Sequence, residues 1–314
     1  MKNVLDSTFF NQQFCVGAPQ NCHDRSAEIA YAISARGRSK GRSDTEETMR
    51  LCSIASGSSG NCIYVGTDTT HVLVDVGISR KRTEEGLHSL GIDPRELDAV
   101  FITHEHSDHI SGLGVFSRKY NVPIYATSKT VDAICRSRSL GAIDEGLFQT
   151  VRADESFTIK DMTVNPMRIS HDAADPVAYR FSYGKQRIGV VTDLGTYNDY
   201  TVECLRGMDA LLLEANHDVN MLQVGPYPYP LKQRILGDRG HLSNENSGRL
   251  LCRLLHDNLK HIVLGHLSKE NNIPQLAYET VRLEINQADN PYRAGDFPIQ
   301  VARRSEVSQV VEIA

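Results

Sequence analysis

The chain has 314 residues, a hydrophobic content of 40% and a formal charge of -5. This length allows one large domain or two small ones, and the composition is ordinary for a protein with a sizeable core. The negative charge excludes a general attraction to nucleic acid, so such binding would need local basic patches.

The seven cysteines are scattered and form no CxxC pair. This pattern argues against a disulfide framework and against a zinc ribbon, and it favours a reducing, cytoplasmic location. No apolar run approaches the roughly 20 residues of a membrane span, so no membrane association is expected. The N-terminus also lacks the apolar stretch of a secretory signal.

Residues 1–48 are polar and contain a basic Ser/Gly/Arg tract from Ser34 to Ser43. They show little periodicity, which predicts a disordered N-terminal extension. A strand-like pattern begins at Met49, which is therefore a candidate for the natural start of translation. The alternative is that the extension is a basic arm with a regulatory or nucleic-acid-binding role. Residues 49–314 are expected to form one folded domain.

From Met49 onward, short β-branched runs alternate with helical patterns. In the first half, the patterns predict strands at 62–65, 71–75, 99–103 and 123–126, and helices at 81–90, 110–120 and 128–137. Asp93 to Glu96 forms a capping box with proline at the first helical position.

The second half is richer in strands. Strands are predicted at 156–159, 163–169, 178–183, 187–192, 210–213 and 261–264, with edge strands at 299–302 and 310–313. Helices are predicted from Asn198 to about Arg206, from Ser243 through a leucine stripe that ends at Leu255, and at 277–285. Because strands occur both in meanders and in βα alternation, two sheets with helices outside are expected.

The segment Thr103–His109 follows the apolar run Val100–Ile102 and carries His104, His106, Asp108 and His109. We expect the first three of these side chains in an extended turn and His109 at the first turn of the next helix. Three imidazoles and a carboxylate at this spacing favour a bound divalent cation.

Four more candidate ligands each follow an apolar strand, namely Asp75, His171, Asp193 and His266. Strand ends at one edge of a sandwich can bring separate segments to one point. Taken singly, His171 or His266 would more often be a hydrogen-bonded buried histidine than a ligand, and Asp193 alone is also compatible with a turn before Gly195.

Together these residues resemble the metallo-β-lactamase superfamily over about residues 49–313. The resemblance implies an α/β fold, a four-layer αββα sandwich with two divalent metal ions. It implies that His104, His106 and His171 hold one ion, and that Asp108, His109 and His266 hold the other. Asp193 would then bridge the two ions, and Asp75 would support the ligand loop through hydrogen bonds.

The resemblance also narrows the chemistry. His106 stands where di-iron relatives carry a carboxylate, and Asp193 stands where true β-lactamases carry cysteine. A bridging carboxylate suits two equally occupied ions such as zinc or manganese. Such a pair favours phosphoester hydrolysis by an activated hydroxide, although thioester hydrolases of the glyoxalase II type use a similar set.

His241, in Gly240-His241-Leu242-Ser243, resembles in position the general acid of the RNase Z branch. In the expected mechanism, Asp108 orients the nucleophile and His241 protonates the leaving oxygen. Glu214 is a candidate to orient His241 or a ligand. The alternative reading of His241 is a loop histidine near a helix cap.

Several motifs resemble the YycJ branch of the superfamily, which implies 5′-exonuclease action on DNA. They are Ser53–Asn61, Thr103–His109, Glu214–Asp218, Tyr227-Pro228 and Gly240–Asn244. The N-terminal extension departs from this branch.

The candidate substrate-binding residues are Ser58, Ser59, Asn61, His217, Tyr227, Lys232 and Arg234. The Ser/Gly loop suits a phosphate cradle or a tight turn. The segment around Tyr227 suits base stacking or a Pro-rich loop.

We therefore predict a cytoplasmic, metal-dependent phosphodiesterase with DNA as substrate. Hydrolysis of a small cyclic phosphodiester, hydrolysis of a thioester, and a binding module with a structural metal are the alternatives. The sequence leaves open the metal, the choice of DNA or RNA, the end polarity and the oligomeric state.

Overall fold

The computed structural model describes residues 48–314. The predicted disordered extension covers residues 1–48, and of these only Thr48 lies in the described range. The question whether translation starts at Met49 concerns the same residues and stays a prediction. No helix in the described range is long and apolar enough to cross a membrane.

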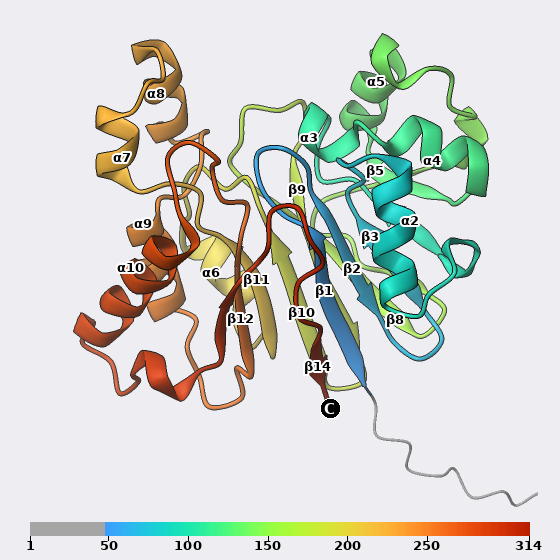
Figure 1. Cartoon of the computed structure of the whole chain (residues 1–314). Helices are drawn as coiled ribbons and strands as arrows, with labels where there is room; N and C mark the ends of the chain where they lie inside the picture. Colours follow the sequence, from blue (N-terminus) through green and yellow to red (C-terminus); the bar gives the residue numbers. More distant parts are fainter. Residues whose placement is uncertain (1–47) are drawn as a thin grey trace, which may run out of the picture. The chain divides into compact units, whose positions relative to one another are not determined.

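Within residues 48–314, two sheets of seven strands face each other (Figure 1). In spatial order the first sheet contains β14 (Val311–Ile313), β1 (Met49–Ala55), β2 (Cys62–Gly66), β3 (His71–Val74), β4 (Ala99–Phe101), β5 (Ile124–Thr127) and β6 (Phe148–Val151). The second sheet contains β13 (Ile299–Val301), β12 (His261–Gly265), β11 (Ala210–Glu214), β10 (Gln186–Val191), β9 (Val177–Tyr183), β8 (Met162–Arg168) and β7 (Phe157–Ile159). The predicted edge strands near the C-terminus are confirmed, because β13 and β14 each end a sheet.

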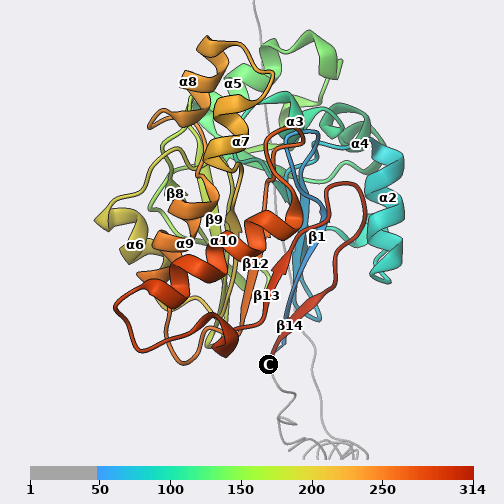
Figure 2. The ribbon, with the colours of Figure 1, turned by 60° about the vertical axis from the view of Figure 1, so that its left-hand side comes forward.

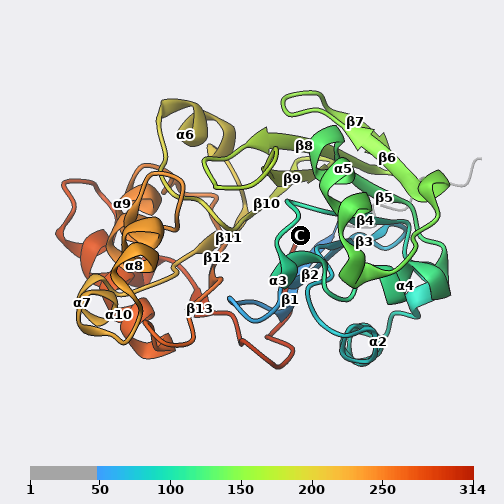
Figure 3. The same ribbon diagram turned by 90° about the horizontal axis from the view of Figure 1, so that it is seen from above.

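Helices cover the outer face of each sheet, which gives the predicted αββα layers (Figures 2 and 3). Those that follow strands of the first sheet are α2 (Arg80–Ser89), α3 (Ser107–Ile110), α4 (Leu113–Tyr120) and α5 (Ser128–Arg136). Those that follow strands of the second are α6 (Asp199–Leu205), α7 (Val219–Val224), α8 (Tyr229–Leu236), α9 (Asn244–Cys252) and α10 (Pro274–Gln287). Short 3-10 turns lie at Pro94–Glu96, Arg138–Leu140, Glu145–Leu147 and Ala294–Asp296.

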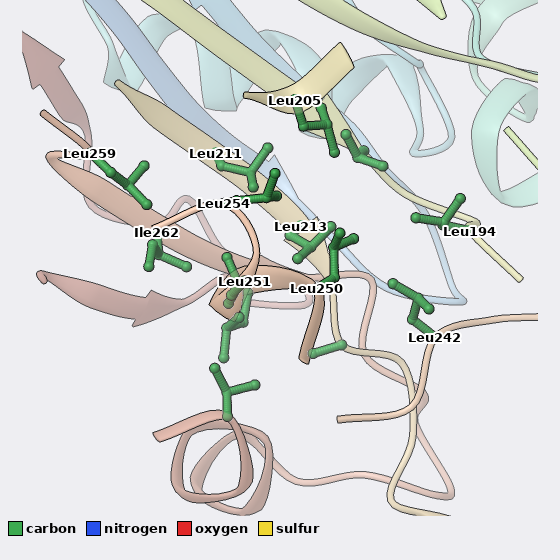
Figure 4. Packing of buried hydrophobic residues seen from close by; sticks show 14 of the residues in the cluster. Leu194, Leu205, Leu211, Leu213, Leu242, Leu250, Leu251, Leu254, Leu259 and Ile262 are labelled. Atoms are coloured by element: carbon green, nitrogen blue, oxygen red, sulfur yellow. The ribbon is translucent and has the colours of Figure 1, made fainter. Parts of the chain in front are cut away.

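The core lies in three layers of apolar side chains. The middle layer joins the two sheets, with Phe101 packed against Tyr179 at a ring-centroid distance of 5.0 Å. Figure 4 shows one outer layer, in which Leu250 and Leu251 of α9 belong to the same buried cluster as Leu211 and Leu213 of β11. The leucine stripe predicted from the sequence is therefore buried against the sheet, where it removes apolar surface from water.

The parallel strands bring the loops that carry the candidate ligands to one end of the sandwich. Strands β3 to β6 run parallel to one another, and so do β10 to β13. Parallel neighbours place their carboxyl ends on the same edge of a sheet. The loops after β3, β4, β10, β11 and β12 therefore meet at one end of the sandwich.

Some sequence predictions were wrong in detail. Asp108 lies in the helical turn α3 rather than in an extended turn, and the helix predicted at 110–120 is interrupted at Gly112. The Gly112 N–H donates to Val76 O at 2.9 Å, and a Cβ at Gly112 would lie 1.9 Å from Ile78 O. This contact with the loop after β3 turns the chain between α3 and α4.

The structure also contains elements that the sequence patterns did not predict. Strand β6 and helix α7 were missed, and the segment around Tyr227, for which a Pro-rich loop was one prediction, leads into helix α8. The capping box at Asp93 is present, but it begins a 3-10 turn of three residues.

Candidate metal centre

Three candidate ligands sit in left-handed backbone conformations at strand ends. Asp75, Asp193 and His266 have φ values of 62°, 58° and 54°. They follow β3, β10 and β12, respectively. Residues with a Cβ rarely adopt this region, and such strain is concentrated at functional sites. The sharp turns place the Asp193 and His266 side chains in the donor cluster and the Asp75 carboxylate against His109 Nδ1.

The six donors that were predicted to form two groups do lie in two groups. In the first, donor atoms of His104, His106 and His171 all lie within 4.8 Å of one another. In the second, donor atoms of Asp108, His109 and His266 lie within the same distance. These side chains come from loops after β4, β8 and β12, so residues distant in sequence are brought together.

Asp193 lies between the two groups. Its Oδ1 is 3.6 Å from His171 Nε2 and 3.3 Å from His266 Nε2. Its Oδ2 is 3.1 Å from His109 Nε2. The side chain is 2% exposed, so the carboxylate is withdrawn from water and faces imidazoles of both groups.

The donor set fits divalent cations. His104 Nε2 and Asp193 Oδ2 are buried and have no hydrogen-bond partner among residues 48–314. A buried polar atom without a partner costs about 1–3 kcal/mol, and a cation would satisfy both atoms. Burial, followed by the neighbouring His109, holds the pKa of His104 well below its usual range. A neutral imidazole is the form that binds a metal.

Asp75 stabilises the loop that carries His104 to His109. Its carboxylate accepts hydrogen bonds from Thr103 N–H at 2.9 Å, Thr103 Oγ1 at 2.9 Å and His109 Nδ1 at 2.7 Å. An acceptor at Nδ1 fixes the His109 proton on that atom and directs Nε2 toward the donor cluster.

Asn61 plays a similar positioning part from the first sheet. It is 1% exposed, and its amide contacts His109 Nε2 and His266 Nδ1, each at 3.2 Å. It also exchanges hydrogen bonds with the backbone of Gly57 and donates to Asp108 O. Asn61 was predicted to bind substrate, but its amide is engaged with the ligand cluster.

The buried Glu214 and the partly exposed His241 form a pair beside the donor cluster. His241 Nδ1 lies 2.8 Å from Glu214 Oε1, and Glu214 Oε2 accepts the N–H groups of Leu194 and Leu242. Burial lowers the pKa of His241, but the Glu214 carboxylate outweighs it and raises the value to about 9. The His241 ring stacks on that of His266, with centroids 5.4 Å apart.

The remaining predicted substrate residues differ in their exposure to solvent. Ser58 and Ser59 are exposed, whereas His217 is buried and its Nδ1 lies 3.3 Å from Asn216 Oδ1. Tyr227 is half-buried in the loop between α7 and α8. Lys232 and Arg234 are described next.

Helices α7 and α8 are tied to the site by polar contacts. Lys232 Nζ donates to Gln223 O at 2.7 Å, which joins the two helices. Arg234 pairs with Asp172 through two hydrogen bonds, and Asp172 follows His171 in the chain. Both cations therefore already have partners within the protein, which limits their use as free phosphate contacts.

Other contacts were missed by sequence reasoning. Gly240 O lies 3.0 Å from His171 Nδ1, and Arg239 donates to His171 O from Nε and Nη2. A backbone carbonyl leaves no signal in the sequence. Arg239 lies two residues before His241, so its place near the site could be predicted from the sequence. Its contact with the His171 carbonyl could not.

Comparisons with known proteins identify the family. Residues 70–266 match the model described as "Beta-lactamase superfamily domain". The chain belongs to the β-lactamase superfamily. It is 43% identical over 236 residues to Exodeoxyribonuclease WalJ of Streptococcus pneumoniae, which covers 75% of this chain and 88% of WalJ. It is 39% identical over 242 residues to Exodeoxyribonuclease YycJ of Bacillus anthracis, covering 74% and 86%.

These similarities confirm the predicted membership of the YycJ-like branch. A solved structure also shares the fold of this superfamily member: the metallo-β-lactamase fold protein YhfI of Bacillus subtilis matches with a TM-score of 0.61. It covers 85% of this chain and 100% of YhfI at 17% identity, so this likeness concerns the fold alone.

Proposed function

We propose that the chain is a metal-dependent phosphodiesterase that degrades DNA from the 5′ end. The observation that carries the proposal is Asp193, whose carboxylate contacts donors of two separate clusters at 3.1–3.6 Å. Support for the substrate comes from WalJ and YycJ, which are named exodeoxyribonucleases and align over most of the chain. Residues 49–314 are proposed as the hydrolase domain.

Two divalent ions, zinc or manganese, are the proposed cofactors. His104, His106 and His171 would hold one ion, and Asp108, His109 and His266 would hold the other, with Asp193 between them. Divalent cations at such a site act as Lewis acids on a phosphodiester and lower the pKa of water. A set of imidazoles and carboxylates suits either metal.

His241 is the proposed general acid. With Nδ1 bound to Glu214, its Nε2 is the free ring nitrogen, and a raised pKa keeps a proton there at neutral pH. Donation of that proton to the leaving oxygen completes bond cleavage. Glu214 is buried and engages three donors, so it positions His241 instead of contacting substrate. Asp108, at 22% side-chain exposure, is the donor best placed to orient an attacking water.

The small-molecule alternatives have less support. Hydrolysis of a cyclic phosphodiester or a thioester uses a similar donor set, but the relatives that align over most of this chain are named exodeoxyribonucleases. The cytoplasmic location expected from the cysteine pattern stays a prediction.

A degradation assay tests the proposal. End-labelled single strands of DNA and RNA, carrying a 5′-phosphate or a 5′-hydroxyl, are incubated with manganese, magnesium or zinc. The expected result is stepwise loss of DNA from the 5′ end, abolished in Asp193→Ala. Cleavage of an acyl-glutathione with no cleavage of any nucleic acid would overturn the proposal.

A further inference from the structure

We propose that Arg304, with the exposed hydroxyls of Ser58 and Ser59, forms a subsite for a second phosphate of the substrate, separate from the phosphate that is cleaved. This inference rests on the proposed function, because it assumes a substrate with more than one phosphate. The anion could be the 5′-terminal phosphate or an internal phosphodiester of the strand.

Arg304 lies beside the Ser/Gly loop although the two are distant in sequence. The connection between β13 and β14 passes alongside the loop between β1 and β2, where Ser56 N–H donates to Arg303 O at 3.3 Å (Figures 1 and 2). Arg304 Nη2 donates to Ser268 O at 2.8 Å, two residues beyond His266. The guanidinium is thereby fixed between the Ser/Gly loop and a ligand-bearing loop.

Gly57 brings Arg304 close to the donor cluster. A Cβ at Gly57 would lie 3.2 Å from Arg304 Cγ, 3.4 Å from Arg304 Nε and 3.0 Å from Leu267 O. The arginine stem therefore packs directly on the loop backbone. The Gly57 N–H and C=O are bound by the Asn61 amide, which contacts His109 and His266. Arg304 is thus linked to the proposed metal ligands through the Gly57 backbone and the Asn61 side chain.

The charge of Arg304 is not balanced within the described protein. Its Nε is buried without a hydrogen-bond partner, and the structure records no ion pair for it among residues 48–314. Its neighbour Arg303 differs, because it is exposed and pairs with Glu306 at 2.9 Å. A partly buried guanidinium without a carboxylate is expected to receive an anion from outside the protein.

Phosphate is the anion that fits these groups. A guanidinium presents N–H donors in a planar fork that matches phosphate oxygens. Ser58 and Ser59 add hydroxyl donors at the exposed tip of the same loop. Among residues 48–314, the recorded hydrogen bond of the Arg304 side chain is to Ser268 O, and no carboxylate is recorded in an ion pair with it.

The test compares Arg304→Ala with Arg303→Ala, a matched control in the next position. Binding of fluorescent single-stranded DNA to each metal-loaded protein is measured by anisotropy at several salt concentrations. Arg304→Ala is expected to weaken binding about 10- to 100-fold, as for loss of a charged hydrogen bond, and to reduce the salt slope by about 1. Arg303→Ala should match the wild type, and Arg304→Lys should recover part of the loss.

Hydrolysis supplies a second readout. Arg304→Ala should raise KM for the oligonucleotide while kcat/KM for bis(p-nitrophenyl) phosphate, which has a single phosphate, stays unchanged. A loss limited to strands with a 5′-phosphate assigns the subsite to the terminal phosphate, and an equal loss with a 5′-hydroxyl assigns it to an internal one.

Equal losses on both substrates, or equal binding by the Arg304 and Arg303 variants, would overturn the inference. If the wild type cleaves no DNA, the proposed function fails, and the anisotropy result still decides whether Arg304 binds a phosphate strand.

Discussion

Replacing Asp75 with asparagine is expected to weaken metal binding without unfolding the protein. The Asp75 carboxylate accepts three hydrogen bonds, two from Thr103 and one from His109 Nδ1. Asparagine keeps the shape of the side chain and tolerates the left-handed φ of 62° at this position. The backbone turn that follows β3 should therefore survive the substitution.

The expected loss of metal affinity follows from the hydrogen bond between His109 Nδ1 and the side chain at position 75. If the asparagine oxygen still accepts from Thr103, its NH2 group faces His109 Nδ1. The imidazole must then offer a lone pair at Nδ1 and carry its proton on Nε2, the nitrogen proposed to bind metal. Loss of a hydrogen bond to a charged group costs about 1.5–3 kcal/mol, which corresponds to about 10- to 150-fold weaker metal binding at 1.36 kcal/mol per decade.

The assay is a metal titration against a competing chromogenic chelator, with melting temperatures of the metal-free proteins measured alongside. Asp154→Asn is the matched control, because Asp154 is exposed and also has a left-handed backbone, with φ of 69°. It should bind metal like the wild type. Wild-type affinity in Asp75→Asn would refute the role of Asp75 in fixing the His109 tautomer.

Three further predictions concern catalysis, packing and pH. His241→Ala should lower kcat by about 10²–10⁴-fold with metal content unchanged by elemental analysis; parallel loss of metal would contradict an acid role. Gly77→Ala should lower both metal content and melting temperature, because its Cβ would lie 1.7 Å from Asp108 O, whereas Gly295→Ala, with open space around the Cβ, should not. Side-chain hydrogen bonds from a lysine and a tyrosine lower the pKa of Glu84 to about 2. A depressed carboxyl pKa adds stability above its unfolded value of about 4.3 and loses it as the pH falls through the folded value. Glu84→Gln should therefore lower the melting temperature at pH 7, and the difference should close toward pH 2; a difference independent of pH would contradict this.

The sequence predicted the layers and the donor types because both leave local patterns. Strands such as Val72–Val74 and Ile262–Leu264 are continuous apolar runs, and each ends directly before or close to a polar ligand type. Strand ends that meet at one edge of the sandwich follow from that alternation. The leucine stripe also predicted correctly which face of α9 is buried.

Long-range and backbone effects could not be read from the sequence. The three prolines at 226, 228 and 230 suggested a loop, yet tertiary contacts such as Arg234 with Asp172 hold a helix there. The break at Gly112 depends on contact with the loop after β3. Arg304 lies in no recognisable motif, and its place beside Gly57 depends on how the last strand crosses to the first sheet.

Anomalous diffraction from crystals of the manganese- or zinc-loaded protein would locate the ions. We expect two peaks in each chain, one contacted by His104, His106 and His171, and one contacted by Asp108, His109 and His266. Asp193 should contact both. A single peak, or ions bound away from Asp193, would contradict the proposed two-ion site.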